Sequence, residues 1–267
     1  MVSSLSIVFM FVTLILCFAL PVVLLFLLFK RTRAAFVCGL LGALGFFVPQ
    51  ICIRLPLLST AAVQTFLGTL PVIPMYLVLA LTAALFETSG RFLVFSLFFK
   101  KPAYGYYEGL AAGVGHGGIE AIFLIGTAYI NNIAFSFLLN NGGLEPILTA
   151  AGLSAKDVNL LIAQLTGTAP ATFLLSGVER VATILLHVVL SVTLFSYMRA
   201  NKALIGFCIV TTIHTCVDFF IPYLQYVSGS IFITELILIL VVAATMLLLV
   251  PAKKRFKSLN PVSDISQ

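Results

Sequence analysis

The chain has 267 residues, of which 61% are hydrophobic and only 9% are charged, and its net charge is +6. A soluble domain carries about 25% charged residues, so this composition excludes an ordinary soluble fold. Several apolar runs exceed the roughly 18 residues that mark a helix crossing the lipid bilayer. Because the basic residues lie in short loops between these runs, membrane topology explains the positive charge, and we expect no binding of nucleic acid.

Seven apolar runs follow one another along the chain. The first lacks the basic start of a signal peptide, so we expect a retained helix. The predicted spans are 5–29, 34–53, 70–99, 106–130, 170–198, 203–223 and 229–250. We therefore expect an all-α, polytopic membrane helix bundle. It would form one transmembrane domain over 1–257, with its core site region at about 85–220 and a disordered cytoplasmic tail over 258–267.

Loop charges predict the orientation of these spans. Basic clusters follow the first, third, fifth and seventh spans, whereas the opposite loops contain only Arg54 and Lys156. Since cytoplasmic loops are enriched in Lys and Arg, the N-terminus should lie outside and the C-terminus in the cytoplasm.

The longest connection covers about 131–170. It begins with Asn131-Asn132, a pair that favours turns. Ser154, with Asp157 three residues later, is similar to a helix capping box. This pattern predicts a loop and then a short helix over 155–165 at the outer interface, either a connector or a lid.

All three histidines lie deep inside predicted spans. At a rise of about 1.5 Å per residue, His116, His187 and His214 each lie roughly 15–17 Å from the cytoplasmic surface, and Glu87 joins this layer. An ionisable residue at such depth is costly and indicates a functional site. We therefore predict that these side chains converge inside the bundle.

Helical spacing groups the acids and histidines further. Three pairs have the i,i+4 spacing that places both side chains on one helix face: Glu87 with Arg91, His116 with Glu120, and His214 with Asp218. The first pair could also be a neutralised structural ion pair. Glu179 and Arg180 are adjacent and diverge by about 100° on a helix, so we expect no ion pair between them.

Glycines surround His116 in the fourth span. Gly109, Gly113 and Gly117 form a small-xxx-small stripe, which allows helices to approach closely. Two explanations stay open, namely tight helix packing, and room for water and an extended peptide beside the imidazole.

Imidazole and carboxylate side chains are the ligands of catalytic zinc, which keeps one position open to water. Without a metal, a glutamate could activate water while a histidine stabilises the oxyanion. The residues do not decide between these schemes. The chain contains no His-Glu-x-x-His, which excludes a zincin.

These residues also carry a family resemblance. Over about 85–220 the chain contains Phe86-Glu87-x-x-x-Arg91, Ala112-x-x-x-His116 and His214-x-x-x-Asp218. In this it resembles the YhfC family of intramembrane metalloproteases, which is similar to the clan of type II CAAX prenyl proteases, PrsW proteases and the anterior-pharynx-defective subunit of gamma-secretase. That clan has Glu-Glu-x-x-x-Arg, Phe-x-x-x-His and His-x-x-x-Asn/Asp. Phe86 and Ala112 depart from this pattern.

The resemblance implies an intramembrane peptidase in a bacterial plasma membrane that cleaves a peptide or membrane-protein substrate. Glu87 or Glu120 would act as the base, with Glu120 replacing the carboxylate missing at Phe86. Arg91 would orient a carboxylate, while His116, His214 and Asp218 would bind a divalent metal such as zinc or stabilise the oxyanion. The candidate metal ligands are His116, His187, His214, Glu120, Asp218 and Glu179.

Three other functions stay open at this point. A non-catalytic scaffold could keep the polar core to specify helix packing. A proton- or metal-coupled transporter could use the same residues as an ion path. A haem b protein could use two histidines as axial ligands.

Overall fold

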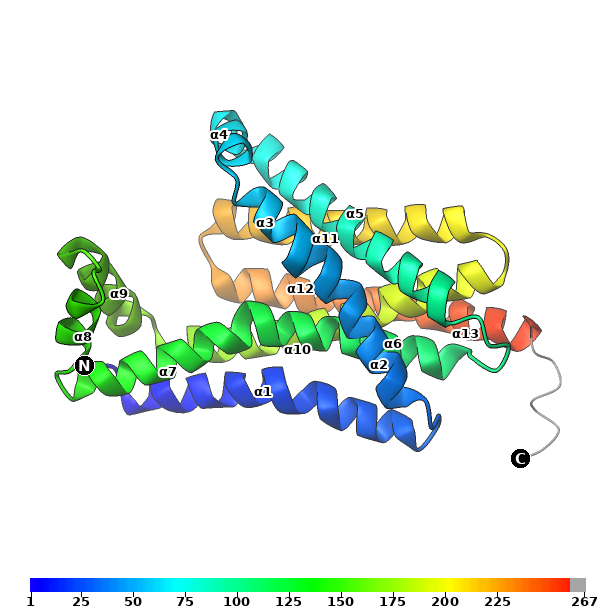
Figure 1. Ribbon diagram of the computed structural model, residues 1–267, viewed down its shortest axis with the longest axis horizontal. Coiled ribbons are helices and arrows are strands. Elements are labelled where there is room, and N and C mark those ends of the chain that lie inside the picture. The colour runs from blue at the N-terminus through cyan, green and yellow to red at the C-terminus, as the bar shows by residue number, and fades with distance from the viewer. Residues whose placement is uncertain (260–267) are drawn as a thin grey trace. The chain divides into compact units, whose positions relative to one another are not determined.

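The computed structural model describes residues 1–259, and helices are the only regular secondary structure in that range (Figure 1). The elements are α1 (Ser4–Phe29), α2 (Ala35–Phe46), η1 (Phe47–Arg54), α3 (Leu55–Leu58), α4 (Ala61–Thr69), α5 (Val72–Phe98), α6 (Tyr106–Glu120), η2 (Ala121–Gly126), α7 (Thr127–Asn140), α8 (Leu144–Ala150), α9 (Ala155–Gly167), α10 (Pro170–Arg199), α11 (Ala203–Ser228), α12 (Ile231–Thr245), η3 (Met246–Leu248) and α13 (Leu249–Leu259). Among them, η1 and η2 are π-helical and η3 is a 3₁₀ turn.

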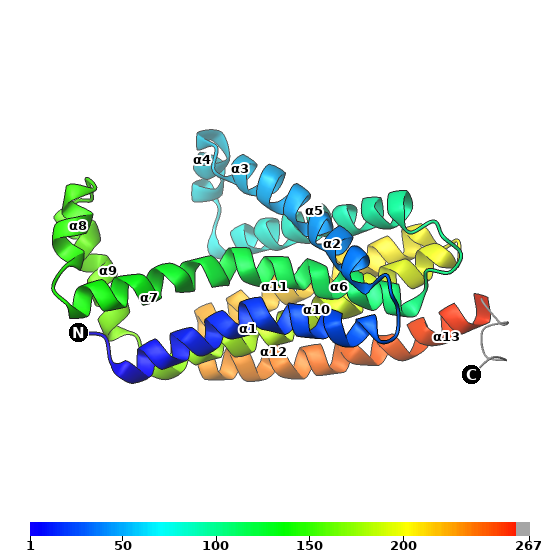
Figure 2. The same cartoon turned by 60° about the horizontal axis from the view of Figure 1, so that its bottom comes forward.

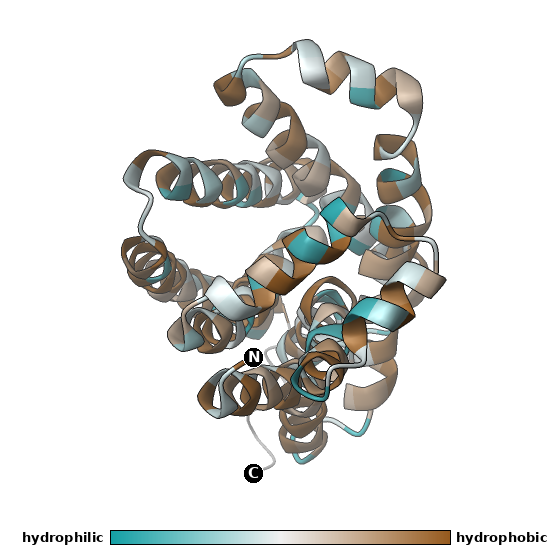
Figure 3. Ribbon diagram, turned by 90° about the vertical axis from the view of Figure 1, so that its left-hand side faces the viewer, coloured by the Kyte–Doolittle hydropathy of each residue, from teal (hydrophilic) through white to brown (hydrophobic). Residues whose placement is uncertain are grey.

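Seven helical segments of the described chain are long and apolar enough to cross a membrane, which confirms the predicted all-α, polytopic fold. Four of them end at least five residues later than predicted: Ala35–Leu58, Tyr106–Asn140, Ala203–Ser228 and Ile231–Leu259. Figure 3 shows hydrophobic residues along most of the helices. Many large apolar side chains are exposed, as expected for helices that face acyl chains and not water.

The connection after the fourth span contains more helix than predicted. The predicted loop between 131 and the short helix was wrong over most of its length, because Asn131 and Asn132 lie inside α7 and Leu144–Ala150 forms α8. Tyr129 and Ile133 on α7 are buried in an apolar cluster with Phe173, and this packing outweighs the weak turn preference of two asparagines. The predicted short helix is confirmed as α9.

The start of α9 matches the predicted cap. Ser154 Oγ accepts a hydrogen bond from the backbone N–H of Asp157 at 3.2 Å and donates to its carboxylate at 2.6 Å. This satisfies one of the four backbone donors that a helix start leaves open.

The chain divides into two compact units, Met1–Leu20 with Ala121–Val181, and Pro21–Glu120 with Ala182–Gln267. Because α1 and α10 each run through both units without interruption, we keep one membrane domain over 1–257 as a proposal. Of the predicted tail, Ser258 and Leu259 complete α13, and 260–267 lie outside the described residues.

Within the second unit, glycine backbones bring α2 into contact with α5 and α6 (Figures 1 and 2). A Cβ on Gly115 of α6 would lie 1.8 Å from the carbonyl oxygen of Gly39 on α2. A Cβ on Gly90 of α5 would lie 2.0 Å from the carbonyl oxygen of Gly45. No side chain fits at such distances, so only glycine permits these crossings.

The predicted glycine stripe on α6 faces α10. A Cβ on Gly113 would lie 2.5 Å from the Cα of Val188, and one on Gly117 would lie 2.8 Å from the Cα of Ile184. Helix backbone therefore fills the space beside these glycines. Of the two explanations left open by the sequence, the structure supports close packing.

Candidate metal centre

Glu87 on α5 is the central residue of a buried polar cluster in the second unit, with only 3% of its surface exposed. Its Oε2 lies 3.0 Å from His116 Nε2 on α6, 3.9 Å from His187 Nδ1 on α10 and 3.8 Å from His214 Nε2 on α11. One carboxylate oxygen thus faces three imidazoles from three other helices.

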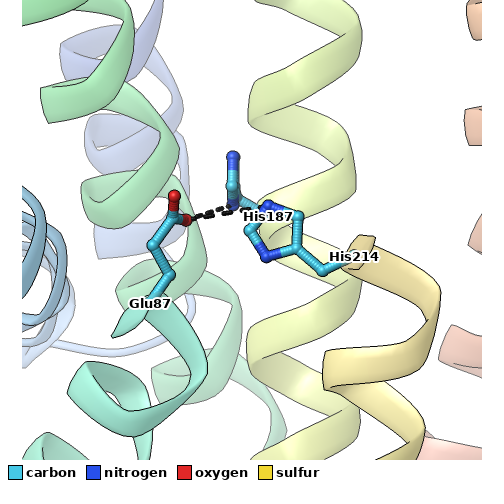
Figure 4. A group of neighbouring side chains, drawn as sticks. All are labelled: Glu87, His187 and His214. Carbon is cyan, nitrogen blue, oxygen red and sulfur yellow. Dashed lines mark ion pairs between the residues drawn. The ribbon is translucent and has the colours of Figure 1, made fainter. Parts of the chain in front are cut away.

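Three of these side chains form a donor set for a metal ion. One ligand atom from each of Glu87, His187 and His214 lies within 4.8 Å of the other two, and all three residues are buried. Figure 4 shows them pointing toward one another from three helices. Two imidazoles and one carboxylate are the protein ligands of several catalytic zinc sites. The residues present therefore fit a divalent ion.

Arg91 contributes the positive charge next to Glu87. Its Nη2 contacts His187 Nδ1 and lies 3.5 Å from Glu87 Oε2. Its Nε and Nη1 are buried and have no hydrogen-bond partner in the described part of the chain. The guanidinium thus neutralises the carboxylate and still has two donors that point at no acceptor.

Two further carboxylates contact the histidines of the cluster. Glu120 Oε2 contacts His187 Nε2, and Asp218 Oδ2 lies 3.3 Å from His214 Nε2. The Asp218 side chain is 30% exposed, more than any other member of the cluster. Glu120 contacts the nitrogen of His187 that is turned away from Glu87, and a carboxylate in that position fixes the ring orientation of a metal-binding histidine and raises its affinity for the ion. Asp218 instead contacts the same nitrogen of His214 that faces Glu87. Helical spacing associated Glu120 with His116, but the structure places it against His187.

Glu179 differs from the other predicted ligands because it belongs to the first unit. Its Oε1 forms an ion pair with Arg180 Nη2. Our expectation of no pair between these neighbours was wrong, since a long arginine side chain can reach across the 100° between adjacent residues.

Sequence analysis missed two residues of this cluster. Gln50 Nε2 donates to Glu87 Oε1 at 3.2 Å, and Arg54 Nη1 donates to Gln50 Oε1 at 3.4 Å. Arg54 is only 7% exposed, so assigning it to an outer loop was wrong. The signal that could have found them is their i,i+4 spacing inside an apolar span.

Comparison with known proteins gives two matches. The model of the YhfC intramembrane metalloprotease family matches residues 16–255. A relative from Bacillus subtilis (strain 168), the uncharacterized membrane protein YhfC, is 33% identical over 181 residues, which are 66% of this chain and 68% of the relative. No solved structure matches the chain. The family match extends well beyond 85–220 and includes the span that carries Gln50 and Arg54.

Proposed function

The chain belongs to the YhfC intramembrane metalloprotease family, and we propose that it hydrolyses a peptide bond of a membrane-embedded peptide or protein. The observation that carries this proposal is the buried set of Glu87, His187 and His214, whose ligand atoms lie within 4.8 Å of one another. Since the chain is a multi-pass membrane protein, we further propose that it acts in a bacterial plasma membrane, with its C-terminus in the cytoplasm.

Glu87, His187 and His214 would hold the ion. A divalent ion at such a site polarises the substrate carbonyl and makes a water molecule a stronger nucleophile near neutral pH. The surrounding residues orient these ligands. His116 Nε2 lies 3.0 Å from Glu87 Oε2 and would hold the carboxylate, while Glu120 holds His187.

Asp218 is our choice for the general base. It contacts His214 at 3.3 Å, and its 30% exposure gives it a path for proton exchange with water. It would accept the proton from the attacking water and pass it to the leaving amine, as one group does in acid–base catalysis. Arg91 keeps two buried donors, Nε and Nη1, without a partner among the described residues. These would stabilise the oxyanion that forms on the carbonyl oxygen.

The experiment is a comparison of membrane proteomes. The host cells would lack their own gene for this protein and would express the wild type, Glu87→Gln or His214→Ala. Glu145→Gln is the matched control, because the side chain of Glu145 is exposed on α8. Mass spectrometry of newly formed peptide termini should detect the same membrane-protein fragments in the wild type and the control. These fragments should be absent from the cells that express Glu87→Gln or His214→Ala. Identical fragments in all four strains would reject the proposal.

A further inference from the structure

Gln50 and Arg54 contact the centre from a helix to which neither a metal ligand nor a base has been assigned. The geometry points to these two residues as a positioning pair, in which Arg54 fixes the amide of Gln50 and Gln50 fixes the carboxylate of Glu87. This inference rests on the proposed function, because its effect is on metal binding by Glu87.

The two oxygens of Glu87 have different surroundings. Oε1 accepts a hydrogen bond from Gln50 Nε2 at 3.2 Å. Oε2 faces the three histidines, the nearest of which is His116 at 3.0 Å. With Oε1 held, the carboxylate cannot rotate freely about its last bond, and Oε2 stays directed at His187 and His214. Such an outer contact lowers the entropy that a ligand loses when it binds an ion.

Arg54 determines which end of the Gln50 amide faces Glu87. Arg54 Nη1 donates to Gln50 Oε1 at 3.4 Å, and arginine has no acceptor atom. The amide must therefore direct its NH₂ group toward Glu87. In the flipped orientation, Gln50 Oε1 would face the carboxylate oxygen of Glu87, and two acceptors would repel each other.

Arg54 is itself anchored on α5, the helix that carries Glu87. Its Nε donates to Thr82 Oγ1 at 3.2 Å and its Nη2 to the carbonyl oxygen of Leu79 at 2.7 Å. The guanidinium is thus held by two hydrogen bonds on the side away from Gln50. A continuous chain of hydrogen bonds runs from α5 through Arg54 and Gln50 and returns to α5 at Glu87.

Local backbone structure places the pair. Both residues lie in the π-helical segment η1, which also contains Pro49. Proline supplies no backbone N–H, and short π-helical turns occur often at functional sites. The close approach of Gly45 to Gly90, where a Cβ would lie 2.0 Å from a carbonyl oxygen, brings η1 within hydrogen-bonding reach of α5. The position of Gln50 therefore depends on the same glycine contact that packs the two helices.

The test measures zinc affinity in detergent micelles, with cobalt(II) spectra as a second readout. The variants are Gln50→Met, which keeps length but removes the amide, Arg54→Met, and the double variant. Gln225→Leu is the matched control, because Gln225 Oε1 accepts a hydrogen bond from Thr234 at 2.8 Å between α11 and α12. Gln50→Asn replaces Gln50→Met if that variant does not fold, since its shorter amide cannot reach Glu87.

Loss of an outer contact typically weakens metal binding about 10–100-fold. We expect that loss, with an altered cobalt spectrum, for Gln50→Met, and a loss of similar size for Arg54→Met. The double variant should be no weaker than Gln50→Met, because Arg54 acts through Gln50. The control should bind as the wild type does.

Two results overturn the inference, and they are distinguishable. If the wild type binds zinc and Gln50→Met binds it equally well, the positioning pair is rejected while the proposed function stands. If the wild type binds no zinc, the proposed function fails and the positioning pair fails with it.

Discussion

Glu120 and His187 meet across two helices, with Oε2 of the acid against Nε2 of the ring. Nδ1 of the same ring is thereby directed inward, 3.9 Å from Glu87 Oε2. Glu120 was a candidate for the catalytic base, but from this contact we propose that it holds a metal ligand instead. Since the two roles differ in their effect on metal binding, they can be separated by experiment.

Replacing Glu120 by alanine should weaken zinc binding about 10–100-fold, the usual loss when a histidine ligand loses its carboxylate partner. Glu120→Gln should keep most of the affinity, because an amide oxygen can still accept the hydrogen bond from His187. Isothermal titration of the purified protein measures both. Equal affinity in Glu120→Ala and the wild type would return Glu120 to the list of possible bases.

Arg91 should compete with the ion for the same carboxylate. Breaking a buried ion pair costs about 3–5 kcal/mol, so Arg91→Gln should unfold at a lower temperature than the wild type in the presence of EDTA. Zinc should raise the unfolding temperature more in the variant, because no guanidinium then contacts His187 and Glu87. Thermal unfolding with EDTA and with zinc measures both shifts. A zinc shift of the same size in both proteins would show that the two cations do not compete.

Gly115→Ala should force α2 and α6 apart. Its Cβ would lie 1.8 Å from the carbonyl oxygen of Gly39, and overpacking of this kind costs about 1–3 kcal/mol. Gly68→Ala is the control, because nothing lies within 4 Å of its Cβ on α4. Alanine should stabilise that helix by about 0.5–1 kcal/mol. Denaturation in micelles compares the two variants, and similar stability would argue against the close crossing of α2 and α6.

The orientation of the chain is also open to a direct test. Because Arg54 is buried, Lys156 is the one basic residue that remains in the predicted outer loops of the described chain, 1–259. This increases the difference in positive charge between the outer and the cytoplasmic loops. We expect a C-terminal green fluorescent protein fusion to fluoresce and a C-terminal alkaline phosphatase fusion to be inactive. The opposite pair of results would invert the topology.

Hydropathy predicted the seven spans because the length and polarity of a segment are properties of the sequence alone. The common depth of His116, His187 and His214 followed from the same reasoning, since depth is a count of residues along a helix. The sequence did not predict which side chains of this layer face one another, because the rotation of each helix about its axis depends on packing. The partner of Glu120 is an example: spacing suggested His116, whereas the contact is with His187.

Gln50 and Arg54 were not predicted to belong to the site, for a related reason. An arginine at the end of an apolar run has the same appearance in the sequence whether it faces water or a carboxylate on another helix. The contact between Gly45 and Gly90 brings this segment against α5, where Arg54 finds its partners, and a contact between two helices cannot be predicted from the sequence of either helix alone. Asn131 and Asn132 were likewise assigned to a loop, because Phe173, which shares an apolar cluster with the neighbouring Tyr129 and Ile133, lies far along the chain.

The most direct test of the metal centre is the metal content of the protein purified without chelators, wild type against His214→Ala. Inductively coupled plasma mass spectrometry should find close to one divalent ion per wild-type chain and almost none in the variant, with both proteins folded. Equal metal content in the two, or none in a folded wild type reconstituted with zinc, would contradict the assignment of Glu87, His187 and His214 as ligands.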